Sequence, residues 1–365
     1  MRWNWEKSDW PNFSYNSERL AKYELEFIKQ SGMLLGAYSH VDNQEQQKIV
    51  ISIISDEAQK TSEIEGENLN RESIQSSIRR NFGLDADISR VSPAENGISM
   101  MMVELYRHFK NDISDELLFH WHRLLTEGSE DLKAGAYRTG SDPMQVVSGY
   151  VHKPTVHFEA PPSERVPEEM SGYINWFRAA TAEKNRGEGI LIKAALAHWY
   201  FISIHPFEDG NGRIGRALAE KMISIHLGEP LLLSLSSVIQ KNRSAYYDIL
   251  EQSNKENEIT AYLIYFSELV LESLAYSQKL VSFIIKKGKL YNRVKDELNS
   301  RQSKVIARIF KEGPDGFDGG LSAKNYASIA KSPHATTTRD LQDLVAKGVL
   351  RKEGQLKSTR YFLDI

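Results

Sequence analysis

Apolar residues recur at three- and four-residue spacings along most of the chain, which is the spacing of one face of an α-helix. In the segment 16–38 they fall at Leu20, Tyr23 and Phe27, and Ser17 is placed to cap this helix. The same pattern predicts helices in four further segments: 43–66, 116–128, 167–181 and 213–228. The fold is therefore expected to be mainly α-helical.

Two regions depart from this pattern. Residues 135–162 are rich in Gly, Pro and β-branched residues, so they predict a loop or a short β-hairpin. The chain from Leu298 onward predicts a short helix, a turn, and a helix from Ser332 to Gly348 with Pro333 at its N1 position. Two short alternating segments follow, as two strands would.

The order of these last elements resembles a winged helix-turn-helix. The expected recognition helix has inward-facing Leu341, Leu344 and Val345 and outward-facing His334, Thr337 and Arg339. The segment 298–365 carries 12 Lys and Arg against 7 Asp and Glu, whereas the whole chain has a net charge of -3. This balance permits DNA binding but is weaker than that of a dedicated DNA-binding domain, so dimer contacts and target presentation remain alternatives.

Composition limits the remaining choices. A length of 365 residues exceeds one average domain, and we expect three segments, 1–95, 96–285 and 298–365. The chain has no Cys, which excludes disulfides, thiolate metal sites and cysteine nucleophiles. It shows neither a signal peptide nor an apolar run of about 18 residues, so we expect a cytoplasmic protein without a membrane partner.

One stretch, HPFEDGNGRIGR at residues 205–216, gathers polar and glycine residues behind an apolar run. Pro206 ends the preceding helix, and the helical pattern resumes after the next glycines. Gly210, Asn211 and Gly212 are therefore expected at a helix N-terminus. Free backbone N–H groups and the helix dipole make such an end an anion site, and glycine lets a phosphate approach closely.

The charged residues of this stretch extend that picture. Arg213 and Arg216 are three positions apart, so both project from one face of the first turn and complete a triphosphate cradle. Asp209 adds a carboxylate of the kind that holds Mg²⁺ beside phosphates. His205 can accept a proton near neutral pH, so it is the candidate general base.

Every specified position of this stretch matches the signature of the Fic family, His-Pro-Phe-x-Asp/Glu-Gly-Asn-Gly-Arg-x-x-Arg, which it resembles. The resemblance implies a Fic-type helical core with a β-hairpin flap, and transfer of AMP from ATP to a Ser, Thr or Tyr hydroxyl of a target protein. His205 would be the base, Asp209 the Mg²⁺ ligand, and Phe207 an anchor of the loop. The implied ATP site comprises Asp209, Gly210, Asn211, Gly212, Arg213, Ile214, Gly215 and Arg216.

A second stretch, TSEIEGE, places Thr61 and Glu65 four residues apart at a helix end, so that they share a face. It resembles the Fic inhibitory motif Ser/Thr-x-x-x-Glu-Gly/Asn, here ending at Gly66. By that resemblance Glu65 pairs with Arg216 and occupies the space of the γ-phosphate, so that ATP binds in an unreactive pose. A further role of Glu65 in removing AMP stays open.

Three other segments resemble parts of Fic proteins. The hairpin region lies where they capture an extended target segment by strand addition. The stretch NRSAYYDIL makes Asn242 and Tyr246 candidates for nucleoside contacts, with ordinary core packing as the alternative. Residues 2–13, with three of the six Trp, resemble a small domain found ahead of Fic cores. Self-modification and a homodimer are also left open.

Two alternatives remain. A transcription regulator could sense nucleotide through the same cradle without transferring it, but sensing alone would need neither His205 nor Asp209. A metal hydrolase built on His198, His205 and His226 is less favoured, because clustered carboxylates and an i, i+4 histidine pair are missing.

Overall fold

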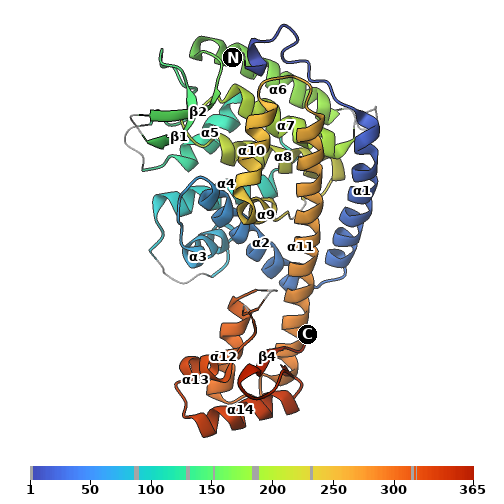
Figure 1. Ribbon diagram of the computed structural model, residues 1–365, viewed down its shortest axis with the longest axis vertical. Helices are drawn as coiled ribbons and strands as arrows, with labels where there is room; N and C mark the ends of the chain where they lie inside the picture. Colours follow the sequence, from blue (N-terminus) through green and yellow to red (C-terminus); the bar gives the residue numbers. More distant parts are fainter. Residues whose placement is uncertain are drawn as a thin grey trace. The chain divides into compact units, whose positions relative to one another are not determined.

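The computed structural model describes residues 3–85, 90–128, 132–150, 153–182, 189–230, 233–313, 316–317 and 319–365 (Figure 1). Helices dominate these residues and the strands form two short hairpins, so the predicted mainly α-helical fold is confirmed. The chain divides into two compact units, Met1–Ala37 with Val50–Ser277, and Tyr38–Ile49 with Gln278–Ile365. The limits of the three predicted sequence segments stay predictions.

The helices begin with α1 (Ser17–Ser39), α2 (Asn43–Ile64), α3 (Arg71–Asn81), α4 (Pro93–Arg107), α5 (Asp115–Leu125), α6 (Val166–Ala182), α7 (Ile190–Ile204) and α8 (Asn211–Leu227). They continue with α9 (Leu235–Lys241), α10 (Arg243–Ser253), α11 (Thr260–Val294), α12 (Ser300–Lys311), α13 (Ala323–Ala330) and α14 (His334–Ala346). The strands are β1 (Gln145–Tyr150), β2 (Lys153–Glu159), β3 (Leu350–Glu353) and β4 (Arg360–Leu363). Within the described ranges, no helix has both the length and the apolar character needed to cross a membrane.

Two helix starts differ from expectation by one residue. Asn16, rather than Ser17, caps α1, because its Oδ1 accepts the backbone N–H of Arg19 at 3.2 Å. Pro333 is the N-cap of α14 and not its N1 residue, since its ψ of 157° is extended and the helix begins at His334.

Helix α7 forms the centre of the first unit. Its nearly unbroken apolar sequence is buried along almost its whole length. Helix α8 packs along it, and Gly215 permits the approach, because a Cβ there would lie 3.0 Å from Ile202 Cγ2 and 3.4 Å from His198 Cδ2. The two helices are joined by residues 205–210, so the signature loop is held between buried elements.

Strands β1 and β2 form the hairpin expected within residues 135–162. They pair antiparallel from Gln145 opposite Glu159 onward, with a shift of register between Val146 and Val147. Val151 and His152, between the strands, lie outside the described residues. The predicted hairpin is therefore present in the first unit. Its role in capturing a target stays a prediction.

The Trp-rich N-terminal segment packs against strand β2. Trp5 Nε1 donates to the carbonyl of Glu159 at 2.7 Å, and the ring of Trp3 meets that of Phe158 edge-on, with centroids 5.5 Å apart. The segment thus fixes the end of the hairpin.

The second unit has its own core, to which α12, α13, α14, β3 and the C-terminal half of α11 contribute. Leu341 and Leu344 are buried and Val345 partly buried, as expected, and His334 and Arg339 are exposed. The expected exposure of Thr337 is wrong: its side chain is 1% exposed. It lies four residues before Leu341, so it shares the inward face. The winged-helix assignment remains a prediction.

Candidate active site

The signature loop begins at a strained residue. His205 ends α7 with φ 52° and ψ 59°, a left-handed conformation that is uncommon outside glycine. Arg138 holds it there, since its Nε donates to the carbonyl of His205 at 2.8 Å and its backbone N–H donates to that of Pro206 at 3.0 Å. Arg138 is 4% exposed and was not identified from the sequence.

The imidazole of His205 is arranged to accept a proton. Its Nδ1 lies 3.4 Å from the carbonyl of Ile202, and a carbonyl can only accept, so the proton belongs on Nδ1 and Nε2 keeps its lone pair. Burial, followed by the positive charge of Arg138, lowers the pKa of His205 to about 4. The ring is therefore neutral at physiological pH.

Phe207 and Asn211 close the loop. The side-chain amide of Asn211 donates to the carbonyl of Phe207 at 2.8 Å and accepts its N–H at 3.0 Å. The ring of Phe207 is fully buried and stacks on His122 with centroids 4.3 Å apart. Because both ends of the Asn211 amide are engaged within the loop, its backbone N–H is the group left for a phosphate.

Helix α8 starts immediately after the loop, with Gly210 as N-cap at φ 81°. Glycine has no side chain with which to cap this end, and backbone N–H groups at such a helix start suit an anion. Ile214 is different: its side chain is fully buried and its N–H bonds to the carbonyl of Gly210 at 3.0 Å. Of the predicted ATP-site residues, Ile214 and Gly215 therefore serve packing in this structure.

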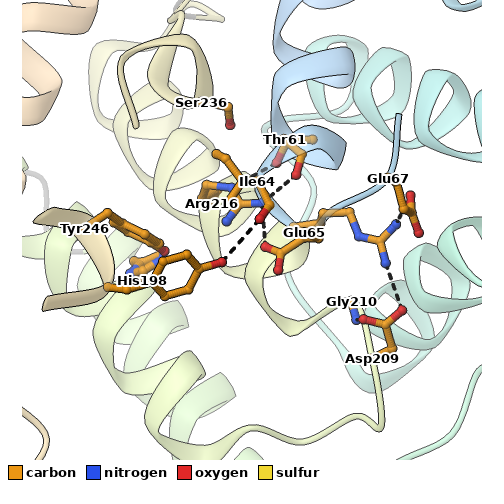
Figure 2. A network of polar contacts seen from close by, with 12 residues as sticks. Thr61, Ile64, Glu65, Glu67, His198, Asp209, Gly210, Arg216, Ser236 and Tyr246 are labelled. Carbon is orange, nitrogen blue, oxygen red and sulfur yellow. Dashed lines mark hydrogen bonds and ion pairs between the residues drawn. The ribbon is translucent and has the colours of Figure 1, made fainter. Parts of the chain in front are cut away.

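Arg216 is bound by the end of α2, as Figure 2 shows. Its Nε donates to Thr61 Oγ1, and its Nη2 donates to the Thr61 carbonyl and to Glu65 Oε1, each at 2.9 Å. The side chain of Arg216 is 2% exposed, and its Nη1 has no hydrogen-bond partner among the described residues. Burial opposes the charged form, yet the Glu65 carboxylate raises the pKa of Arg216 above its usual value.

The end of α2 is a Schellman cap that directs this contact. The N–H of Glu67 bonds to the carbonyl of Ser62 at 3.0 Å, and that of Gly66 to Glu63 at 3.1 Å. Gly66 has φ 90°, which an L-residue rarely adopts. Gly and Asn are the residues favoured in this position, which gives a physical reason why the motif that TSEIEGE resembles ends in Gly or Asn.

Glu65 reaches the first turn of α8. A Cβ added at Gly212 would lie 2.2 Å from Glu65 Oε1 and 3.1 Å from Arg216 Nη1. Glycine at position 212 therefore leaves a space that the carboxylate enters. The Glu65 carboxylate thus lies against the N-terminal turn of α8, and its competition with a phosphate there stays a prediction.

Arg213 forms a second contact, with Glu67 and Asp209, which are both labelled in Figure 2. Its Nη1 donates to Glu67 Oε2 at 2.8 Å and its Nη2 to Asp209 Oδ2 at 3.1 Å. The side chain of Arg213 is 2% exposed, against 35% for Glu67 and 49% for Asp209. Sequence reasoning missed Glu67 because the matched inhibitory motif ends one residue earlier.

A pair of buried acids lies behind the Arg216 contact. Glu57, one turn before Thr61 on α2, accepts the N–H of Ser236 at 2.9 Å, and its carboxyl group hydrogen-bonds that of Glu220 on α8. Burial raises the pKa of Glu57 to about 7 and that of Glu220 well above its usual value. Burial thus favours the protonated form of both carboxyl groups.

The donor set suits a shared Mg²⁺ ion. Asp209 offers one half-exposed carboxylate, whose Oδ1 also accepts the N–H of Gly210 at 2.6 Å. Mg²⁺ commonly takes one or two carboxylates together with substrate phosphates. No cluster of three His, Asp or Glu residues suited to a metal occurs among the described residues. A metal here would fit between Asp209 and bound phosphates.

The alternative prediction of a metal hydrolase built on His198, His205 and His226 is wrong. Both ring nitrogens of His198 are engaged, Nδ1 with the hydroxyl of Tyr262 at 2.7 Å and Nε2 with that of Tyr246 at 2.9 Å. His226 donates Nδ1 to the carbonyl of Met222 at 2.9 Å. His198 instead holds Tyr246 in place.

A cleft of about 700 Å³ opens in front of these groups, large enough for a nucleotide-sized ligand. Its lining includes Glu65, His205, Gly212, Arg216 and Tyr246. Strands β1 and β2 and helix α10 supply further walls. Asn242 is exposed and is not part of this lining, so its nucleoside contact stays a prediction.

Comparison with known proteins agrees with this geometry. Residues 112–223 match the model of the Fic/DOC family. This part of the chain is a Fic domain. Residues 3–84, ahead of the Fic domain, match a domain of unknown function, DUF4172, and they include the stretch from Thr61 to Gly66 that resembles the inhibitory motif.

Several relatives of the Fic domain carry names. The chain is 26% identical over 204 residues to protein adenylyltransferase fic-1 of Caenorhabditis briggsae, covering 55% of this chain and 36% of that protein. It is 30% identical over 98 residues to a probable protein adenylyltransferase of Aquifex aeolicus, covering 27% of each. The chain thus spans about a third or less of the length of these relatives.

Solved structures show the fold. A Fic family protein from Desulfovibrio desulfuricans aligns with a TM-score of 0.53 at 21% identity, covering 93% of this chain and 95% of its own. A Fic domain containing signaling protein from Bacteroides thetaiotaomicron also aligns at 0.53, with 20% identity, covering 69% and 97%. The similarity of fold to these proteins extends well beyond residues 112–223.

Proposed function

We propose that this protein is an adenylyltransferase that transfers AMP from ATP to a hydroxyl of a target protein. The observation that carries the proposal is the neutral imidazole of His205 on the wall of a cleft that is also lined by Gly212, in the first turn of α8, and by Arg216. The names of the relatives support the same activity.

The chemistry follows from these groups. The target hydroxyl loses its proton to Nε2 of His205, and its oxygen forms a bond to the α-phosphorus of ATP. The bond from that phosphorus to the bridging oxygen breaks, and pyrophosphate leaves. The first turn of α8 and the two arginines supply positive charge for the phosphates. Mg²⁺, held by Asp209 and the phosphates, would add charge neutralisation.

The target would lie along the hairpin. Val147 on β1 and Val156 on β2 are 50% and 37% exposed, so the hairpin offers apolar surface beside the cleft. An extended segment added there would gain backbone hydrogen bonds and place its hydroxyl near His205. Self-modification would use a hydroxyl of the same or another copy.

In the proposed mechanism, Glu65 inhibits AMP transfer. The carboxylate sits against Gly212 and on Arg216, so the γ-phosphate and Glu65 compete for one guanidinium. The segment matched by DUF4172 would then act as the inhibitory part of the protein. A nucleotide-sensing regulator that uses the second unit is the alternative function.

The decisive experiment compares the Glu65→Ala variant with two double variants, Glu65→Ala with His205→Ala and, as the control, Glu65→Ala with His226→Ala, using labelled ATP and Mg²⁺. Loss of label transfer in His205→Ala, with ATP binding and melting temperature retained, is expected if His205 is the base. The His226 variant removes a half-buried histidine at the other end of α8 and should still transfer. Transfer by His205→Ala at the control rate would refute the mechanism.

A further inference from the structure

The two arginines of the α8 cradle are each held by a carboxylate from the turn that follows α2. Glu65 holds Arg216 and Glu67 holds Arg213, at 2.9 and 2.8 Å. The Schellman cap at Gly66 allows both side chains to point the same way, because the chain reverses between them. The inhibitory motif accounts for the first contact alone.

The Arg213 contact is not an ordinary surface ion pair. Arg213 is 2% exposed, so its charge needs a partner when no nucleotide is bound. Its partners are Glu67 and Asp209, and its Nε has no partner in the described part of the chain. A phosphate that binds Arg213 must displace Glu67, or share the guanidinium with it against charge repulsion.

Asp209 is drawn into the same contact. Its Oδ2 accepts from Arg213 and its Oδ1 from Gly210. When Glu67 fixes the guanidinium of Arg213, it also fixes the carboxylate that we propose for Mg²⁺. Glu67 would therefore compete with the metal and the β-phosphate, whereas Glu65 would compete with the γ-phosphate.

We propose that Glu67 is a second inhibitory carboxylate, which competes with the triphosphate for Arg213 independently of Glu65. This inference rests on the proposed function, because Glu67 is inhibitory only if the cradle binds ATP for transfer. The competition between Glu67 and an anion for Arg213 is a statement about binding alone. It deepens the proposed regulation by predicting that removal of Glu65 releases only half of the cradle.

The test measures binding of inorganic tripolyphosphate and of ATP to the full chain by calorimetry, with and without Mg²⁺. Glu67→Ala, Glu65→Ala and the double variant are compared with wild type and with Glu63→Ala. Glu63 is the matched control, because its carboxylate bonds to Lys60 on the same helix at 2.7 Å and not to the cradle. Glu67→Gln removes the charge and retains the side-chain volume, so it tests the same contact if the alanine variant misfolds.

Glu67→Ala should bind tripolyphosphate about tenfold more tightly than Glu63→Ala, which corresponds to about one charge-assisted hydrogen bond released to the ligand. The double variant should bind more tightly than either single variant. Equal affinity of Glu67→Ala, Glu67→Gln and Glu63→Ala would overturn the proposal. Tighter binding without AMP transfer in any variant would retain it and refute the proposed function instead.

Discussion

Truncation of Glu65 should destabilise the free protein and yet strengthen its response to ATP. Glu65→Ala removes one charge-assisted contact from Arg216, which is 2% exposed. Breaking a fully buried pair costs about 3 to 5 kcal/mol. Here the carboxylate is 25% exposed and Thr61 keeps its two hydrogen bonds to Arg216, so we expect about 1 to 3 kcal/mol.

ATP should then recover this loss. A ligand at 100 times its Kd stabilises the folded state by about 2.7 kcal/mol, and in a domain of this size each kcal/mol moves the melting temperature by about 2 to 4 °C. We therefore expect Glu65→Ala to melt a few degrees below wild type without nucleotide. With ATP and Mg²⁺ at a fixed concentration it should show the larger upward shift, because its affinity is higher.

The assay is thermal unfolding across an ATP titration, followed by label transfer with the same preparations. Glu63→Ala is the control, since its partly buried i, i+3 pair with Lys60 contributes about 0.5 kcal/mol. An additional Arg216→Ala should abolish the gain, because inhibitor and phosphate use this side chain. The reasoning fails if Glu65→Ala gains no more stability from ATP than Glu63→Ala does.

Four further predictions concern other parts of the chain. The pKa of Glu57 is raised to about 7 in the folded state, so the stability that its protonated form contributes is full below about pH 4.5 and is lost as pH rises through about 7. The raised pKa of Glu220 acts in the same direction. Urea unfolding should therefore show a higher free energy of unfolding at pH 5 than at pH 8, and Glu57→Gln should reduce this difference. Gly212→Ala should displace the Glu65 carboxylate by steric conflict, and unchanged ATP affinity in calorimetry would contradict this. The lowered pKa of His205 predicts that transfer by a Glu65 variant keeps its rate as pH falls through 6.5 and loses it near 4; a midpoint at 6.5 in the rate profile would count against the assignment. Deletion of 298–365 should leave a first unit that still transfers AMP, and its loss of helical circular dichroism would show that the boundary is misplaced.

Local sequence patterns determined the helical class and the candidate chemistry. The spacing of apolar residues located α1, α2, α5, α6 and α8, because burial of one helix face requires it, but it did not predict α3, α4 or α11. The order of His205, Asp209 and Arg216 placed a candidate base, a carboxylate and a cation around one helix end, because neighbours in a loop and a first turn must lie close together. The spacing of Thr61 and Glu65 likewise follows from helix geometry.

Contacts between distant segments were decided by tertiary structure alone. Arg138 lies 67 residues before the His205 carbonyl that it holds, and nothing in its own neighbourhood of the sequence indicates that partner. Glu67 meets Arg213 across 146 residues, and a charged residue after a helix ordinarily faces solvent. The same limit applies to Glu57 and Glu220. Sequence fixes which groups are near each other along one helix, whereas packing between helices selects which charges become buried partners.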